Sequence, residues 1–96
     1  MGKREEYIDK LEAQLREWNK QIDELQEKAE KQSQEAKTKI QIRMKNLKAK
    51  RSELKLKLDK IKDSGEDAFE KIKDDSEKLW KDVKSGLSEI SKIIKE

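Results

Sequence analysis

One short stretch decides how this chain folds, Asp63-Ser64-Gly65-Glu66-Asp67. Only here do residues that end a helix and residues that begin one occur together. Glycine destabilises a helix interior by about 1 kcal/mol relative to alanine and commonly follows the last helical residue. The side chain of Asp63 or Ser64 can cap a following helix, and the two acidic residues after the glycine suit its positive end. The sequence therefore predicts a hinge at residues 63–67, where Gly65 can supply a positive φ.

The charge of the chain changes sign around this hinge. Residues 37–62, the basic block, contain 11 Lys or Arg and two acidic residues, a net charge of +9. Residues 1–36 and residues 63–96 each carry a net charge of −3. A straight chain would align the basic block with copies of itself in a parallel oligomer, and like charges repel. We therefore expect an antiparallel hairpin that sets the acidic last third against the basic block.

Composition limits the class of protein. The 96 residues are 49% charged and 31% hydrophobic, with no proline. Such a composition is typical of disorder or of long helices that bury a narrow apolar seam. The chain also has no cysteine and no histidine, which removes disulfides, thiolate and imidazole chemistry and the usual zinc sites. We expect no enzymatic activity, and assign no catalytic, metal-binding or cofactor-binding residue.

Helical periodicity before the hinge favours a long coiled-coil helix. Apolar residues recur every three or four positions from Ile8 onward, change phase near Ala36, and resume a heptad pattern as far as Ile61. This pattern predicts one helix over about residues 3–62. Periodicity after the hinge predicts a second helix over about residues 66–94. The expected fold is thus all-α, a single helical domain over residues 1–96 with a long helix at 1–62, a hinge at 63–67 and a returning helix at 68–96.

Pairing of the two helices predicts the core of the hairpin. The core residues that we expect are Ile40, Met44, Leu47, Leu54, Leu58, Ile61, Phe69, Ile72, Leu79, Trp80, Val83, Leu87, Ile90 and Ile94.

The first helix is longer than the second, so its first 30 or so residues have no partner in this hairpin. We therefore expect a homo-oligomer, a dimer or larger, in which these residues pair with another copy. A sparse second stripe on the basic block can add to that contact. The predicted oligomer seam comprises Ile8, Leu11, Leu15, Trp18, Ile22, Leu25, Ile42, Ala49 and Leu56.

Two binding functions remain as alternatives. Lysine and arginine side chains of the basic block can contact phosphates, which would give salt-sensitive, sequence-independent nucleic-acid binding. Internal or intersubunit pairing with the acidic helix competes with that role. Residues 68–94 form an amphipathic helix that can lie on a lipid surface through Phe69, Trp80 and Ile94, although its net negative charge disfavours an anionic membrane.

Three segments resemble a known group of proteins. They are the opening KREEYIDKLEAQLREW (Lys3 to Trp18), the hinge SGEDAFE (Ser64 to Glu70) and the tail EKLWKDVK (Glu77 to Lys84). They look like small bacterial coiled-coil proteins described as coiled-coil domain-containing or stress-response family proteins, many of which carry Trp where Phe69 stands here. The resemblance implies a cytoplasmic, helical, non-enzymatic protein linked to stress, and supplies no functional residues.

These observations favour a structural or interaction protein that acts as a scaffold or stabiliser through homo-oligomerisation. The start of the chain lacks an apolar leader, and no apolar run approaches the roughly 20 residues that span a membrane. We therefore expect a cytoplasmic protein without cofactors. We expect a protein partner in preference to nucleic acid or a lipid surface.

Overall fold

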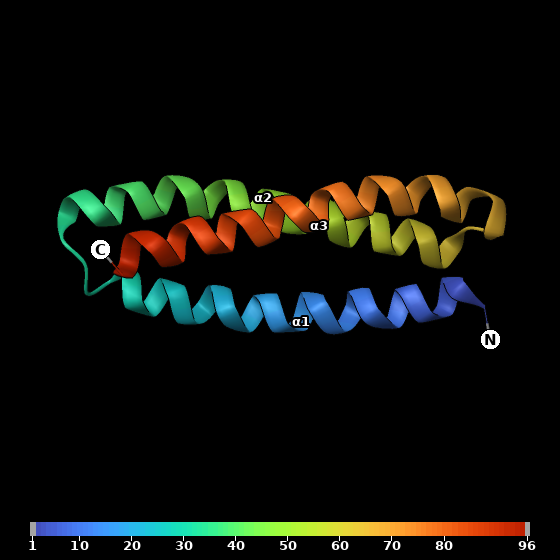
Figure 1. Ribbon diagram of the computed structural model, residues 1–96, viewed down its shortest axis with the longest axis horizontal. Helices are drawn as coiled ribbons and strands as arrows, with labels where there is room; N and C mark the ends of the chain where they lie inside the picture. The colour runs from blue at the N-terminus through green and yellow to red at the C-terminus, as the bar shows by residue number, and fades with distance from the viewer. Residues whose placement is uncertain (1, 96) are drawn as a thin grey trace.

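The computed structural model describes residues 2–95, which form three α-helices and no strand. The helices are α1 (Lys3–Ala29), α2 (Gln34–Asp63) and α3 (Glu66–Lys95). They run up, down and up in one elongated bundle of 49 × 18 × 17 Å. Figure 1 shows the N-terminus beside the α2–α3 turn at one end and the C-terminus beside the α1–α2 loop at the other. The expected all-α fold is confirmed, whereas the expected two-helix hairpin becomes a three-helix bundle.

The long helix predicted over residues 3–62 is wrong, because the chain leaves the helix between Ala29 and Gln34. Ser33 has extended backbone, with φ −62° and ψ 161°, and its side chain accepts a hydrogen bond from the backbone N–H of Ala36 at 3.3 Å. Ser33 is therefore the N-cap of α2. The break lies beside the phase change near Ala36, which in sequence looks like a change of supercoil rather than a loop.

Folding back gives α1 a partner within its own chain. Four of its residues are buried in the core that α2 and α3 share, namely Leu11, Leu15, Trp18 and Ile22, and Ile8 and Leu25 pack partly buried beside them. Burying four such side chains stabilises the fold by at most about 6–12 kcal/mol. This gain exceeds the free energy of the helical hydrogen bonds that are lost at the break. The expectation that these residues have no partner within their own chain is therefore wrong. The other three members of the predicted oligomer seam, Ile42, Ala49 and Leu56, are exposed on α2.

The hairpin of α2 and α3 contains every residue assigned to its core. Most are buried, and Ile72, Trp80 and Ile94 are half-buried. These two helices pack together more extensively than α1 packs on either. Gly86 contributes to their close approach, since a Cβ built there would lie 3.1 Å from Cδ1 of Leu47.

The turn between α2 and α3 lies at the predicted hinge, but its capping interactions differ from the predicted ones. Ser64 follows the end of α2 with extended backbone, and its hydroxyl donates to the carbonyl of Lys60, so it closes α2 rather than capping α3. The carbonyl of Gly65 accepts the first hydrogen bond of α3, from the N–H of Phe69. No glycine among the described residues has positive φ, so the expectation that Gly65 supplies one is wrong. The reversal takes only the two residues Ser64 and Gly65 between the helices.

Candidate binding surfaces

The side of α2 that faces α3 is neutralised by a regular ladder of ion pairs. Arg43 lies 3.5 Å from Glu89, Lys50 lies 3.6 Å from Asp82, and Lys57 lies 3.6 Å from Asp75. Both sets of residues recur every seven positions, in opposite directions along the chain, so each pair lies two helical turns from the next. We call these three pairs the ion-pair ladder. It sets the antiparallel register of α2 and α3, as charged residues flanking a coiled-coil seam do.

The side of α2 that faces α1 has a second row of lysines at the same spacing, Lys48, Lys55 and Lys62. Only Lys62 has an acidic partner, the carboxylate of Glu12 at 3.1 Å. Lys48 and Lys55 form no ion pair with any residue in the described range 2–95. Positive charge on this side of the basic block is therefore only partly neutralised.

A groove between α1 and α2 concentrates this charge. Its volume is about 600 Å³, and ten residues line it: Glu12, Leu15, Arg16, Asn19, Arg51, Ser52, Lys55, Leu58, Asp59 and Lys62. Arg51 is held at its edge by a hydrogen bond from Nη1 to Oδ1 of Asn19, at 3.0 Å. Four cationic and two acidic side chains surround apolar atoms of Leu15 and Leu58. This α1–α2 groove suits an anionic ligand better than a neutral one.

The outer face of α2 has an apolar stripe within a polar surface. Ile42 and Leu56 are 61% and 62% exposed, and Ala49 lies midway between them. We call these three residues the outer stripe. Their spacing of seven residues puts them on one face of the helix. The exposed side chains of Lys45, Glu53 and Lys60 share that face. The charged neighbours of the outer stripe are therefore two basic residues and one acidic residue.

All four aromatic side chains of the protein form one cluster where α1 meets α3. The rings of Trp18 and Trp80 are 5.5 Å apart in edge-to-face geometry, and Tyr7 lies 5.9 Å from Phe69 and 6.4 Å from Trp80. The ammonium of Lys73 lies 5.7 Å from the ring of Tyr7. Such contacts add about 0.5–1.5 kcal/mol each to the burial of the rings. This aromatic cluster anchors α1 on α3.

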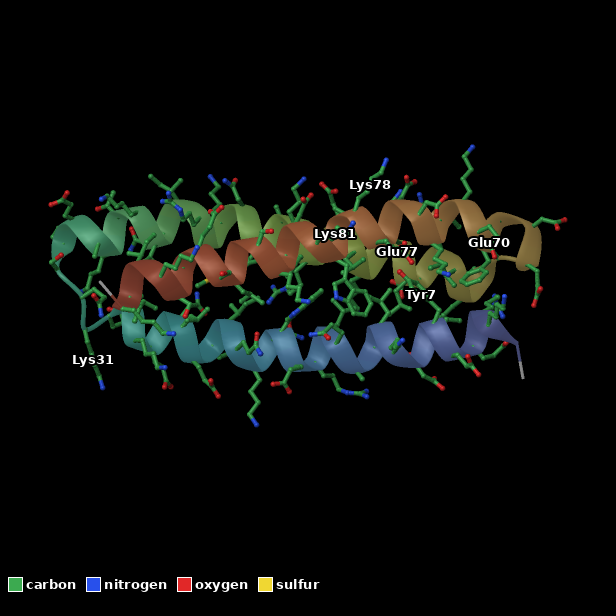
Figure 2. All side chains as sticks on the ribbon, in the orientation of Figure 1. Tyr7, Lys31, Glu70, Glu77, Lys78 and Lys81 are labelled. Carbon is green, nitrogen blue, oxygen red and sulfur yellow. The ribbon has the colours of Figure 1, made fainter. Side chains whose placement is uncertain are left out.

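The hydroxyl of Tyr7 is buried in the cluster and has no hydrogen-bond partner within the described residues. Figure 2 shows Tyr7 between α1 and α3, close to Glu77 of α3. Burial, aided by the negative charge of Glu77, raises the pKa of Tyr7 to about 12. The phenol is therefore neutral at ordinary pH and acts as a packing group.

Arg4 is a key residue that the sequence analysis missed. Its Nε donates to the carbonyl of Ile61 at 3.1 Å, and its Nη2 donates to the carbonyl of Lys62 at 2.7 Å. Both carbonyls lie in the last turn of α2, where the carbonyl of Ile61 also accepts from the backbone N–H of Ser64 at 3.3 Å. The guanidinium adds charged donors there and complements the negative end of the helix dipole. The residues are 57 or more positions apart, so only the folding back of α1 could reveal this cap.

The apolar face of residues 68–94, considered above for lipid binding, lies inside the bundle. Phe69 is 3% exposed, and Trp80 and Ile94 pack half-buried against the core. A lipid surface could reach this face only if α3 left the bundle. None of the described helices is long and apolar enough to cross a membrane.

The part of the chain that the structure describes holds no group of three acidic residues arranged as metal ligands. The acidic hinge residues Asp63, Glu66 and Asp67 are exposed at the end of the bundle.

Searches against protein-family models, curated proteins and solved structures found no match for this chain.

Proposed function

We propose that this is a non-enzymatic interaction protein that binds an acidic amphipathic helix of a partner protein along the outer face of α2. The observation that carries the proposal is the outer stripe, two large apolar side chains about 60% exposed on a basic helix. Such residues are often scattered singly on monomeric surfaces. Here they lie two heptads apart with Ala49 midway, so the three residues follow the heptad spacing along which a partner helix can pack. The scaffolding or stabilising role expected from the sequence would use this face.

Charge favours an acidic partner over a second copy of the same face. Residues 34–63 contain 11 Lys or Arg and four acidic residues, so α2 carries a net charge of +7. Two copies of α2 placed face to face would bring like charges together, whereas an acidic helix would complement Lys45 and Lys60. Full burial of Ile42 and Leu56 would add about 1–2 kcal/mol each, so we expect a weak, reversible contact.

The test uses a synthetic helical peptide with leucine at the a and d positions of each heptad and glutamate at e and g. Isothermal titration should detect binding that weakens as salt is raised. The double variant Ile42→Ser, Leu56→Ser should bind about 30- to 700-fold more weakly, because both apolar contacts are lost. Ile42→Leu is the matched control and should bind like the original chain. Equal binding by the serine variant, or no binding by the original chain, would contradict the proposal.

Nucleic-acid binding is the second candidate, and the uneven neutralisation of α2 favours it. Phosphates would lie along the α1–α2 groove, near Lys48 and Lys55, rather than on the α3 side. The chain offers a matched pair of variants, Lys48→Gln, Lys55→Gln against Lys50→Gln, Lys57→Gln, which remove the same charge from the two sides. A filter-binding titration with a random-sequence duplex at two salt concentrations should show the larger loss for the first variant. Equal losses of affinity in the two variants would show that binding depends only on net charge, and would refute a role for the groove.

A further inference from the structure

We propose that α1 can exchange between two copies of this chain. In the resulting dimer, residues 3–63 of each copy form one continuous helix, and each α1 packs on the α2–α3 hairpin of the other copy. The inference does not depend on the proposed partner helix, because the outer stripe faces solvent in the single chain and in the exchanged dimer alike.

The loop between α1 and α2 is built of residues that also suit a helix. It reads Glu30-Lys31-Gln32-Ser33, with no glycine or proline. The backbone of Glu30 is helical, at φ −61° and ψ −24°. The N–H groups of Lys31 and Gln32 bond to carbonyls three residues back, at 3.2 and 3.0 Å. The helical turn thus continues through Lys31, and the chain leaves it at Gln32 and the extended Ser33. Straightening therefore changes the backbone mainly at these two residues.

The contacts that hold α1 can form equally well between two chains. The packing of Leu11 and Trp18 on the hairpin, the contact of Trp18 with Trp80, and the cap of Arg4 on the end of α2 do not depend on the loop that joins them. Exchange therefore changes the free energy only through the loop and through association. Of the three helices, α1 has the least packing to release, because α2 and α3 contact each other most.

The two states differ greatly in length. The single chain is 49 Å long. A continuous helix over residues 3–63 would be about 90 Å long at 1.5 Å per residue. Since α1 is antiparallel to α2 (Figure 1), the two long helices of a dimer would also run antiparallel, with one three-helix bundle at each end. Lys31 points away from the bundle in Figure 2, so its side chain does not hold the loop closed.

Two substitutions at the loop between α1 and α2 should shift the equilibrium between the single chain and the exchanged dimer in opposite directions. Ser33→Ala removes the N-cap of α2 in the single chain, but a continuous helix needs no cap there. Because two loops straighten in each dimer, we expect the dimerisation constant to rise on the order of 30-fold. Gln34→Pro suits the single chain, because position 34 is the first residue of α2 and Ser33 already has the extended backbone that precedes proline. Proline inside a continuous helix should lower the constant on the order of 10,000-fold.

Each variant is refolded at high protein concentration and examined by light scattering and small-angle X-ray scattering, with circular dichroism as the check that helix content is kept. We expect Ser33→Ala to form a dimer about 90 Å long. We expect Gln34→Pro and the double variant to remain monomers of the original length. A Ser33→Ala protein that stays monomeric at every concentration would overturn the proposal. So would a Gln34→Pro protein that dimerises as readily as the original chain.

A mixing experiment tests whether α1 itself crosses between chains. One copy carries Trp18→Phe and the other carries Trp80→Phe, so neither has the tryptophan pair that lies 5.5 Å apart in the original chain. Co-refolding should restore the circular dichroism signal of that pair, because α1 of one copy then meets α3 of the other. The same mixture with Gln34→Pro in both copies is the control. Dimers without the restored signal would show association through another face and would refute the exchange.

Discussion

Replacing Arg4 tests whether α1 is fastened to the end of α2. The side chain is 19% exposed and donates two hydrogen bonds, to the carbonyls of Ile61 and Lys62. Hydrogen bonds from a charged donor contribute about 1.5–3 kcal/mol each before the lost rotamer entropy of a long side chain is subtracted, and the helix dipole adds a few tenths. We therefore expect Arg4→Met to lower the free energy of unfolding by about 2 kcal/mol. In a chain of this size, that loss lowers the melting temperature by roughly 10 °C.

The assay is urea denaturation followed by circular dichroism. Lys3→Met is the matched control, because Lys3 is exposed at the same helix end and its loss changes the net charge equally. It should alter the free energy of unfolding by less than about 0.5 kcal/mol. Arg4→Lys keeps the positive charge but lacks the guanidinium that donates to both carbonyls. It should therefore recover less than half of the lost unfolding free energy. If Arg4→Met and Lys3→Met have equal stability, the cap contributes nothing and the reasoning is wrong.

Two further predictions concern the hinge and the aromatic cluster. Gly65→Ala should stabilise the protein by about 0.4–1 kcal/mol, because Gly65 has no positive φ and an added Cβ meets nothing within 4 Å; a thermal melt that shows lower stability would refute this. Tyr7 has a pKa of about 12 in the folded chain against its ordinary value of 10.0, so the unfolded chain ionises first and the free energy of unfolding should fall as the pH rises between those values. Because the ring is only half-buried, the loss attributable to Tyr7 should be no more than about 1 kcal/mol. Urea denaturation on both sides of pH 10.0 measures it, and an identical pH dependence in Tyr7→Phe would contradict the assignment.

The hairpin of α2 and α3 could be predicted because its signals are local or simply periodic. Apolar residues such as Leu47, Leu54 and Val83 follow helical spacing, and helical spacing arises from hydrogen bonds between neighbouring residues. The opposite charges of the basic block and the last third indicated their antiparallel pairing. The ion-pair ladder reflects that complementarity residue by residue.

The candidate surfaces were only partly predictable. The heptad spacing of Ile42, Ala49 and Leu56 identified the outer stripe, but an apolar residue in a helix can be covered or exposed, and sequence spacing does not say which. The α1–α2 groove depends on side chains from two helices that the predicted long helix would have kept apart. The cap by Arg4 likewise links positions that no local pattern relates.

The sequence by itself determined that the chain is helical, where the second reversal lies, and which faces of α2 and α3 meet. These follow from backbone propensity, glycine and capping residues, and the periodicity of apolar and charged side chains. Only the tertiary structure decided that the chain also breaks at residues 30–33. Those residues suit a helix as well as a loop, so local preferences are nearly balanced there. Burial of Trp18 and its neighbours on α2 and α3 favours the loop over the continuous helix by several kcal/mol, because a solitary straight helix would leave these side chains exposed to water.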